Sequence, residues 1–281
     1  MNLKKHLVAL TALGMLSSTA VMAAPFGGVG PGGTGDDGAG TSLTDVFNNI
    51  ATDGTSDVIA STDYLDDDAD STWELGGTNT GSAVLVIEIA GNHASNNMGI
   101  YKGNDQITVF EGAATDVERA VLSINVSGHV IVTRFDGDGL FVSQTVHGDD
   151  VGELTQDWSD NRFGFYLETA SNGTFYSDSD LNADGFDHMA AYQGVGEEVD
   201  LDDALGGDDS ATDGGTLPGP WATNEYILAW EDVSCAANGC DGDYNDMVVM
   251  IESISPVPAP ATLALLGLGL AGLAYSARRK A

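Results

Sequence analysis

The densest group of oxygen ligands in this sequence lies between residues 230 and 246. Trp230-Glu231-Asp232 precedes a short segment with two cysteines, and Asp241-Gly242-Asp243-Tyr244-Asn245-Asp246 follows that segment. Apolar strand-like runs flank both parts, so a hairpin is expected to bring the acidic side chains together. Ca²⁺ takes about six to eight oxygen ligands from carboxylates, amides and carbonyls. We therefore predict a Ca²⁺ site formed by Asp241, Asp243, Asn245 and Asp246, with Glu231 or Asp232 assisting.

A second acidic segment has the spacing of half a calcium-binding loop. Asp180, Asn182 and Asp184 occupy alternate positions, and Gly185 follows where such a loop turns sharply. The position of the usual bidentate Glu holds Ala191 instead. The loop is therefore partial, and a further ligand is needed from Asp178, Asp187 or a distant carboxylate.

Both acidic segments also have a simpler interpretation as solvated turns. Asp and Asn favour turns for local reasons that involve no metal. The chain contains 43 acidic residues, so some alternating pairs must arise by chance. The sequence leaves both interpretations open.

Cys235 and Cys240 lie between the two parts of the first acidic segment. Two thiolates alone are too few ligands for a zinc site. We predict that the pair forms a disulfide that shapes this loop.

Catalytic motifs are absent from the sequence, and we predict that the protein is not an enzyme. The histidines are scattered, and neither a metalloprotease helix motif nor a serine-hydrolase motif occurs. In Asp187-His188 we expect a hydrogen-bonded structural histidine. The four tryptophans, which we expect in or near the core, offer an alternative sugar-stacking face: Trp73, Trp158, Trp221 and Trp230.

Short apolar runs bounded by Gly, Asn and Asp predict β-strands through most of the chain. The expected strands are residues 83–90, 106–110, 120–126, 129–135, 140–146, 162–168, 226–230 and 247–254. Ser127-Gly128 predicts a hairpin turn, and apolar residues at helical spacing predict one helix over residues 43–51. We predict an all-β fold, with a single antiparallel β-sandwich or jelly-roll-like domain over residues 43–255.

The two ends of the chain differ from this middle part. Residues 1–23 combine two lysines, an apolar run and small residues before Ala23, as in a secretory signal peptide. Residues 24–42 form a Gly-rich linker. Residues 261–277 are uncharged and precede Arg278-Arg279-Lys280, which predicts a transmembrane helix with a cytoplasmic basic end.

The charge balance argues against two classes of partner, nucleic acid and anionic lipid. Four basic residues remain between the two ends, against all 43 acidic residues of the chain. Nucleic acid and anionic lipid are bound through Lys and Arg, so neither is expected as a partner of this region.

The C-terminal segment resembles a PEP-CTERM sorting signal, in which Pro-Glu-Pro precedes a membrane helix and a basic end. Val257-Pro258-Ala259-Pro260, the apolar run and Arg278-Arg279 carry this resemblance, with Ala259 in place of the Glu. The resemblance implies processing by an exosortase in bacteria that make exopolysaccharide and biofilm matrix.

Residues from about Trp73 to Glu252 resemble the bacterial family called domain of unknown function 4114, whose members are often exported or on the surface. The matching segments are Met98-Gly99-Ile100-Tyr101, Phe163-Gly164-Phe165-Tyr166, Phe175-Tyr176-Ser177, Asn182-x-Asp184-Gly185-x-Asp187-His188 and Trp230-Glu231-Asp232 with Asp241-x-Asp243-x-Asn245-Asp246-Met247.

We therefore expect an exported, non-enzymatic structural or adhesive protein that is stabilised by Ca²⁺. Its expected location is the inner membrane, the cell surface or the extracellular matrix of a Gram-negative bacterium. The expected partners are an exosortase, the membrane and extracellular polysaccharide. The alternatives are a carbohydrate-binding module that holds exopolysaccharide and a secreted hydrolase.

Overall fold

The computed structural model describes residues 26, 30–31, 42–77, 79–87, 96–112, 114, 118–148, 151–201, 219–236 and 239–257. The predicted signal peptide, most of the linker and the transmembrane segment 261–277 lie outside these residues. So do Pro258, Ala259, Pro260, Arg278 and Arg279 of the sorting motif. Among the described residues, no helix is both long enough and apolar enough to cross a bilayer.

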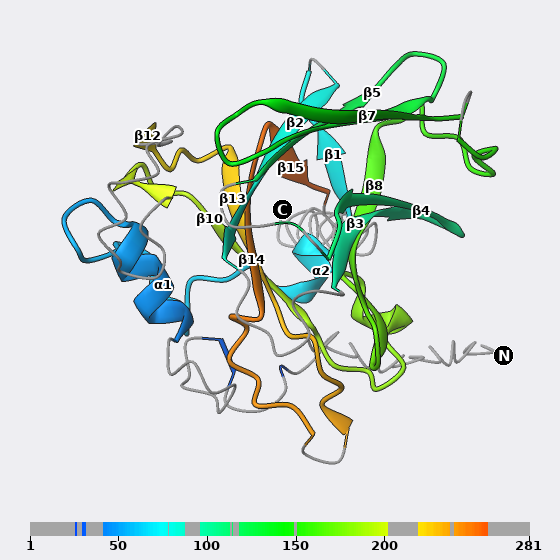
Figure 1. The fold of residues 1–281 in the computed structure, drawn as a ribbon. Helices are drawn as coiled ribbons and strands as arrows, with labels where there is room; N and C mark the ends of the chain where they lie inside the picture. Colours follow the sequence, from blue (N-terminus) through cyan, green and yellow to red (C-terminus); the bar gives the residue numbers. More distant parts are fainter. Residues whose placement is uncertain are drawn as a thin grey trace, which may run out of the picture.

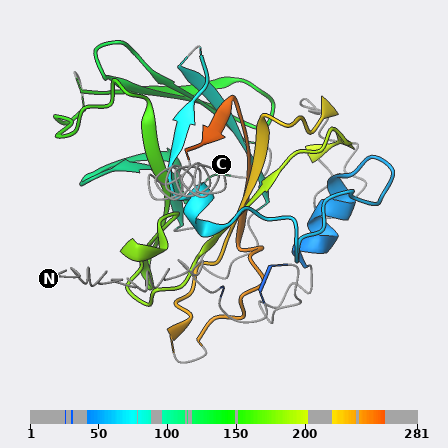
Figure 2. The same cartoon turned by 180° about the vertical axis from the view of Figure 1, so that it is seen from behind.

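Two antiparallel sheets make up most of the described chain, as Figures 1 and 2 show from opposite sides. The first sheet has the order β15 (Ile254–Pro256), β1 (Trp73–Leu75), β8 (Arg162–Thr169), β3 (Asn97–Lys102) and β4 (Asp105–Phe110), and β9 (Gly173–Tyr176) also pairs with β8. The second has the order β10 (Met189–Gln193), β13 (Glu225–Trp230), β14 (Met247–Glu252), β2 (Thr80–Ile87), β5 (Arg119–Ile124), β6 (Val130–Phe135) and β7 (Phe141–His147). A short pair, β11 (Glu198–Val199) and β12 (Gly219–Pro220), lies apart from both sheets. The predicted all-β antiparallel fold is confirmed.

The main core lies between the two sheets. Trp73, Ile100 and Phe165 come from the first sheet, and Leu228 and Val249 come from the second. Alternation along β5, whose burial pattern changes at every residue, places one face of that strand in this core. The sandwich is therefore held by burial of apolar side chains from both layers.

A second core lies on the outer face of β10, β13 and β14. The helix α1 (Leu43–Ile50) covers this face and buries Leu43, Val46, Phe47 and Ile50, which are the residues at helical spacing. Ser42 caps the helix through a reciprocal capping box with Asp45. Because both faces of β13 and β14 are covered, these strands are apolar almost throughout.

Each predicted strand corresponds to an observed one, with one break, and residues 88–90 of the first predicted strand lie outside the described residues. Residues 247–254 are not a single strand, because Ser253 adopts a positive φ of 62°. β14 ends before this residue in the second sheet, and β15 follows it in the first sheet. The predicted hairpin between β5 and β6 is present, with Gly128 at φ 79° in its turn.

Candidate metal centre

The connection between β13 and β14 brings the two parts of the first acidic segment together. Trp230 and Met247 are the last paired residues of these antiparallel strands. Glu231 and Asp232 therefore leave the sheet beside the point where Asn245 and Asp246 return to it. In Figure 1 this connection extends below the lower ends of both strands.

Five of the predicted ligands form two groups of carboxylates that share Glu231. The oxygens of Glu231, Asp232 and Asp246 lie within 4.8 Å of one another, and so do those of Glu231, Asp241 and Asp243. We call these five residues the Glu231 centre. All of them are buried except Asp241, which is half-buried.

Backbone and side-chain hydrogen bonds orient the carboxylates of the Glu231 centre. The Glu231 Oε2 atom accepts from the Gly242 N–H at 2.8 Å, and Oε1 accepts from the Val233 N–H at 3.2 Å. The Asp246 Oδ2 atom accepts from the Asp232 N–H at 2.8 Å. Asn245, the sixth predicted ligand, donates its side-chain amide to Asp243 Oδ2 at 3.0 Å. The loop thus holds its acidic side chains in place through its own backbone.

Burial and mutual repulsion both oppose ionisation of this centre. Burial, then the charges of Asp241 and Asp232, raise the pKa of Glu231 to about 8. Burial, then Glu231, Asp232 and Asp241, raise the pKa of Asp246 well above its usual range. Burial and Asp241 also raise the pKa of Asp232. A bound cation removes this penalty, because it supplies the positive charge that the carboxylates need.

Asn96 is a member of this site that sequence reasoning missed. Its Nδ2 donates to Asp232 Oδ2 at 2.9 Å, and its Oδ1 is buried without a hydrogen-bond partner among the described residues. Amide oxygens are among the ligands that Ca²⁺ accepts. Asn96 directly precedes β3 in the other sheet, far away in sequence, so no local spacing indicated it.

Asp232 also joins the two layers of the sandwich. Asn172, in the turn between β8 and β9 of the first sheet, donates its side-chain amide to the Asp232 carbonyl at 3.0 Å. Together with Asn96, it connects the first sheet to a loop of the second. A cation bound by Asp232 would therefore stabilise the contact between the two sheets.

The second predicted calcium loop has a different arrangement. Asn182 is buried, and its Oδ1 accepts from the Tyr176 N–H at 2.7 Å, while its Nδ2 donates to the Phe186 carbonyl at 2.9 Å. Asp180 is exposed on the 3-10 turn η2 (Ser179–Leu181). Neither Asp180 nor Asp184 belongs to a group of three converging carboxylates in the described part of the chain. Asn182 and Asp184 are therefore engaged by hydrogen bonds within the protein, whereas the Asp180 side chain faces solvent.

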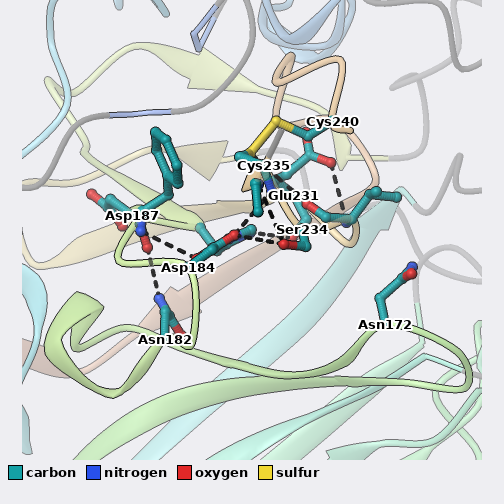
Figure 3. Close-up of polar contacts among 12 residues, drawn as sticks. Asn172, Asn182, Asp184, Asp187, Glu231, Ser234, Cys235 and Cys240 are labelled. Atoms are coloured by element: carbon teal, nitrogen blue, oxygen red, sulfur yellow. Dashed lines mark hydrogen bonds and ion pairs between the residues drawn. A yellow bond between two sulfur atoms is a disulfide. The ribbon is translucent and has the colours of Figure 1, made fainter. Parts of the chain in front are cut away.

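Asp184 links this turn to the cysteine loop. Its Oδ2 accepts from the Cys235 N–H at 2.9 Å and from Ser234 Oγ at 3.0 Å, and Figure 3 shows the carboxylate facing both residues. It also contacts His188 Nε2 at 3.0 Å. Burial opposes ionisation of Asp184, but hydrogen bonds from His188 and Phe186 outweigh it and lower the pKa of this carboxyl.

His188 has the structural surroundings that the sequence suggested. It is fully buried, stacks on Phe175 at a centroid distance of 3.9 Å, and places Nδ1 3.2 Å from the Glu231 carbonyl. Burial lowers the pKa of His188, and the neighbouring Asp184 opposes that shift.

The predicted disulfide between Cys235 and Cys240 is present, with 4.6 Å between the Cα atoms. The disulfide closes a small loop within the β13–β14 connection (Figure 3). This loop lies in sequence between Glu231-Asp232 and Asp241-Gly242-Asp243.

The alternative of a sugar-stacking tryptophan face is wrong. Trp73, Trp158, Trp221 and Trp230 are each 0 % exposed, so no ring is open to a ligand. All four lie in the two cores, as expected, and Trp158 also donates to Asp105 Oδ2 at 3.1 Å.

Comparison with known proteins identifies two regions. Residues 148–253 match the family model described as a domain of unknown function (DUF4114), and residues 256–280 match the PEP-CTERM protein-sorting motif. Both predicted resemblances are confirmed, although the first match begins at residue 148 and not near Trp73. The sorting motif marks an exported protein of the Gram-negative cell envelope that carries a substrate signal for an exosortase. No curated protein and no solved structure matches the chain.

Proposed function

We propose that this protein is a non-enzymatic structural component of the cell envelope, and that Ca²⁺ bound at the Glu231 centre stabilises its folded domain. The observation that carries this proposal is the presence of two groups of three converging carboxylates, mostly buried, which share Glu231 in one loop. Among the described residues, no ion pair with Lys or Arg involves Glu231, Asp232, Asp241 or Asp246. These four carboxylates therefore need a positive charge from outside the described chain, or protons.

The chemistry of the donors favours Ca²⁺ over other metals. The ligands are carboxylates with an amide nearby, and Ca²⁺ prefers hard oxygen donors. Zn²⁺ prefers His and thiolate ligands, but both cysteines are in the disulfide. A loop that offers only oxygen ligands also suits the variable coordination geometry of Ca²⁺ better than the strict octahedron of Mg²⁺.

A structural role follows from what the centre joins. Its loop connects β13 to β14, and Asp232 is hydrogen bonded to Asn96 and Asn172 beside strands of the other sheet. A ligand that binds only the native state stabilises it by mass action, by about 2.7 kcal/mol at a hundred times its Kd.

Calorimetric melting of the full chain in Ca²⁺ and in excess chelator tests this proposal. We expect the melting temperature to rise with Ca²⁺ and to fall when chelator is added. Glu231→Gln should abolish most of this response, because it removes the carboxylate shared by both groups. Glu153→Gln, the same change at an exposed residue, should respond like the wild type. A wild-type melting temperature that does not change with Ca²⁺ would contradict the proposal.

We also propose that residues 261–277 hold the exported domain at the membrane until an exosortase acts on the sorting motif. The PEP-CTERM match supports an exosortase partner. Cell fractionation in hosts with and without the exosortase tests this: the protein should stay in the membrane fraction when the enzyme is missing.

A further inference from the structure

The second sheet ends in β7, an edge strand with one open side. β7 pairs with β6 along its length, and in the described part of the chain its only other β-bridge joins His147 to Val151. The opposite end of the same sheet is closed, because Leu65 donates its N–H to the Ala191 carbonyl of β10 at 2.8 Å. β7 therefore presents backbone N–H and C=O groups that can pair with another strand.

Exposed apolar side chains gather on β7 and in the segments beside it. Leu140, Phe141 and Val142, at the start of the strand, are each between 60 % and 64 % exposed. Val126, in the turn before β6, and Val151, just after β7, are also exposed. These five are the majority of the eight large apolar side chains that are exposed among the described residues. A group of this kind is typical of an interaction surface.

The outer face of β5, β6 and β7 continues this surface. The second core, which lies under α1, contains no residue of these three strands, and Figure 1 shows them at the other end of the sheet from α1. On this face Ile131 lies in register with Val146, and Phe135 lies opposite Phe141. The two phenylalanine rings meet edge to face, with 6.4 Å between their centroids.

This part of the chain carries very little of the protein's negative charge. Of the 43 acidic residues, residues 119–148 contain two, Asp136 and Asp138, and both lie in the turn between β6 and β7. β7 itself has no acidic residue, lysine, arginine or proline, so it lacks the residues that commonly keep edge strands from pairing. Val142 has no partner on β6, but residues 143–147 pair with that strand regularly.

We propose that β7 pairs with β7 of a second copy of this chain, antiparallel across a two-fold axis, so that the two sheets become continuous. Charge argues for this occupant, because two strongly acidic copies can approach closely only where acidic residues are absent. A basic partner would instead be drawn to the acidic surfaces. With a two-fold axis the same strand serves both copies, so no second complementary surface is needed. The pairing does not depend on the Glu231 centre.

Sedimentation velocity of the full chain at rising protein concentration tests this pairing. The wild type should pass from monomer to dimer. Gln144→Glu adds one negative charge to the middle of β7 in each copy without changing its size, and should weaken the dimer by at least about tenfold. Gln106→Glu is the matched control, because Gln106 is also exposed and lies on β4, an edge strand of the first sheet. This variant should dimerise like the wild type.

The two glutamines also make comparable local contacts. Gln144 Nε2 donates to Thr133 Oγ1 at 2.9 Å, and Gln106 Nε2 donates to the Tyr176 hydroxyl at 3.1 Å. In both variants the neighbouring hydroxyl can donate to the new carboxylate instead. Both variants should therefore keep the wild-type melting temperature, and a difference in dimerisation reports the position of the new charge.

A second pair of variants repeats the test with a different change. Val142→Glu places the charge at the exposed start of β7, and Val195→Glu places it at a residue of similar exposure after β10, 60 % against 55 %. Val142→Glu should weaken the dimer by at least about tenfold, and Val195→Glu should not. All variants keep both ends of the chain, so association through other segments would affect them equally.

Amide hydrogen exchange locates the contact. When the protein concentration is raised above the dissociation constant, the backbone N–H groups on the open side of β7 should exchange at least about tenfold more slowly, and those of β4 should not change. A wild type that stays monomeric at every concentration would overturn the proposal and leave β7 to a different occupant. A dimer in which the β7 amides gain no protection would overturn it too, because another surface would then join the copies.

Discussion

Asp180 and Asp184 are four residues apart in one acidic segment, yet the structure gives them opposite surroundings. Asp180 is exposed, whereas the side chain of Asp184 is 3 % exposed and contacts His188, Ser234 and Cys235. The same residue type is a solvated turn residue at position 180. At position 184 it is buried and connects its turn to the cysteine loop.

This contrast predicts unequal effects of the same substitution. Asp184→Ala should reduce the free energy of unfolding by about 3 kcal/mol, because it leaves His188 and the cysteine loop without a buried charged partner. Asp180→Ala should change it by less than about 0.5 kcal/mol. Urea denaturation of both variants, in the same Ca²⁺ concentration, measures the difference. Equal effects would show that the Asp184 contacts contribute nothing to stability.

The raised pKa of Glu231 predicts how stability depends on pH without Ca²⁺. The folded state holds this proton more tightly than the unfolded state, since the pKa rises from 4.5 to about 8. The contribution of Glu231 is therefore fully present below pH 4.5 and is lost as the pH rises to about 8.

A comparison with Glu231→Gln isolates this effect from other groups. His188, whose pKa is lowered by burial, changes stability in the opposite direction over part of the same range. In excess chelator, the wild type should lose stability relative to Glu231→Gln between pH 4.5 and pH 8. Chemical denaturation at a series of pH values measures this difference, and a constant difference contradicts the shift.

Among the elements, α1 determines whether β10, β13 and β14 have one buried face or two. The ring of Phe47 on α1 contacts the Tyr192 ring edge to face, with 4.9 Å between the ring centroids. Its centroid lies 5.8 Å from that of Trp221. These rings belong to the second core, which separates the outer face of the sheet from water.

Truncating Phe47 tests how much this helix contributes. Phe47→Ala should lower the free energy of unfolding by about 3 to 5 kcal/mol, because it leaves a cavity in the second core. Thr44→Ala, on the exposed face of the same helix, should have almost no effect. The two variants are compared by thermal and urea unfolding. A loss below about 1 kcal/mol for Phe47→Ala would mean that the helix is not part of the cooperative unit.

At the scale of the whole molecule, the main feature is a large excess of negative charge. The region between the two ends carries four basic residues against 43 acidic ones. Such an imbalance destabilises the compact state through repulsion of like charges.

Salt should therefore stabilise the protein in the absence of divalent cations. In excess chelator, raising NaCl from about 0.01 M to about 1 M shortens the Debye length from roughly 30 Å to roughly 3 Å. The melting temperature should rise across this range. In saturating Ca²⁺ the rise should be smaller, because the most crowded carboxylates are already neutralised. A melting temperature that falls with NaCl would contradict this account.

Local patterns in the sequence determined several parts of this protein. Apolar residues at helical spacing predicted α1 and its buried face, since both follow from the period of a helix. Alternating runs gave β5 and β6, and Gly128 gave the turn between them. The sorting motif is also local, because it consists of consecutive residues.

Contacts between distant segments decided the rest. β1 and β15 are each three residues long and have no periodic signal, yet they pair with each other across most of the chain. Asn96 shows no ligand spacing, and only the packing of the two sheets buries it beside Asp232. The sequence identified the acidic residues of the Glu231 centre, because one hairpin connects them. Burial, which sets both their pKa values and their need for a cation, depends on the whole sandwich.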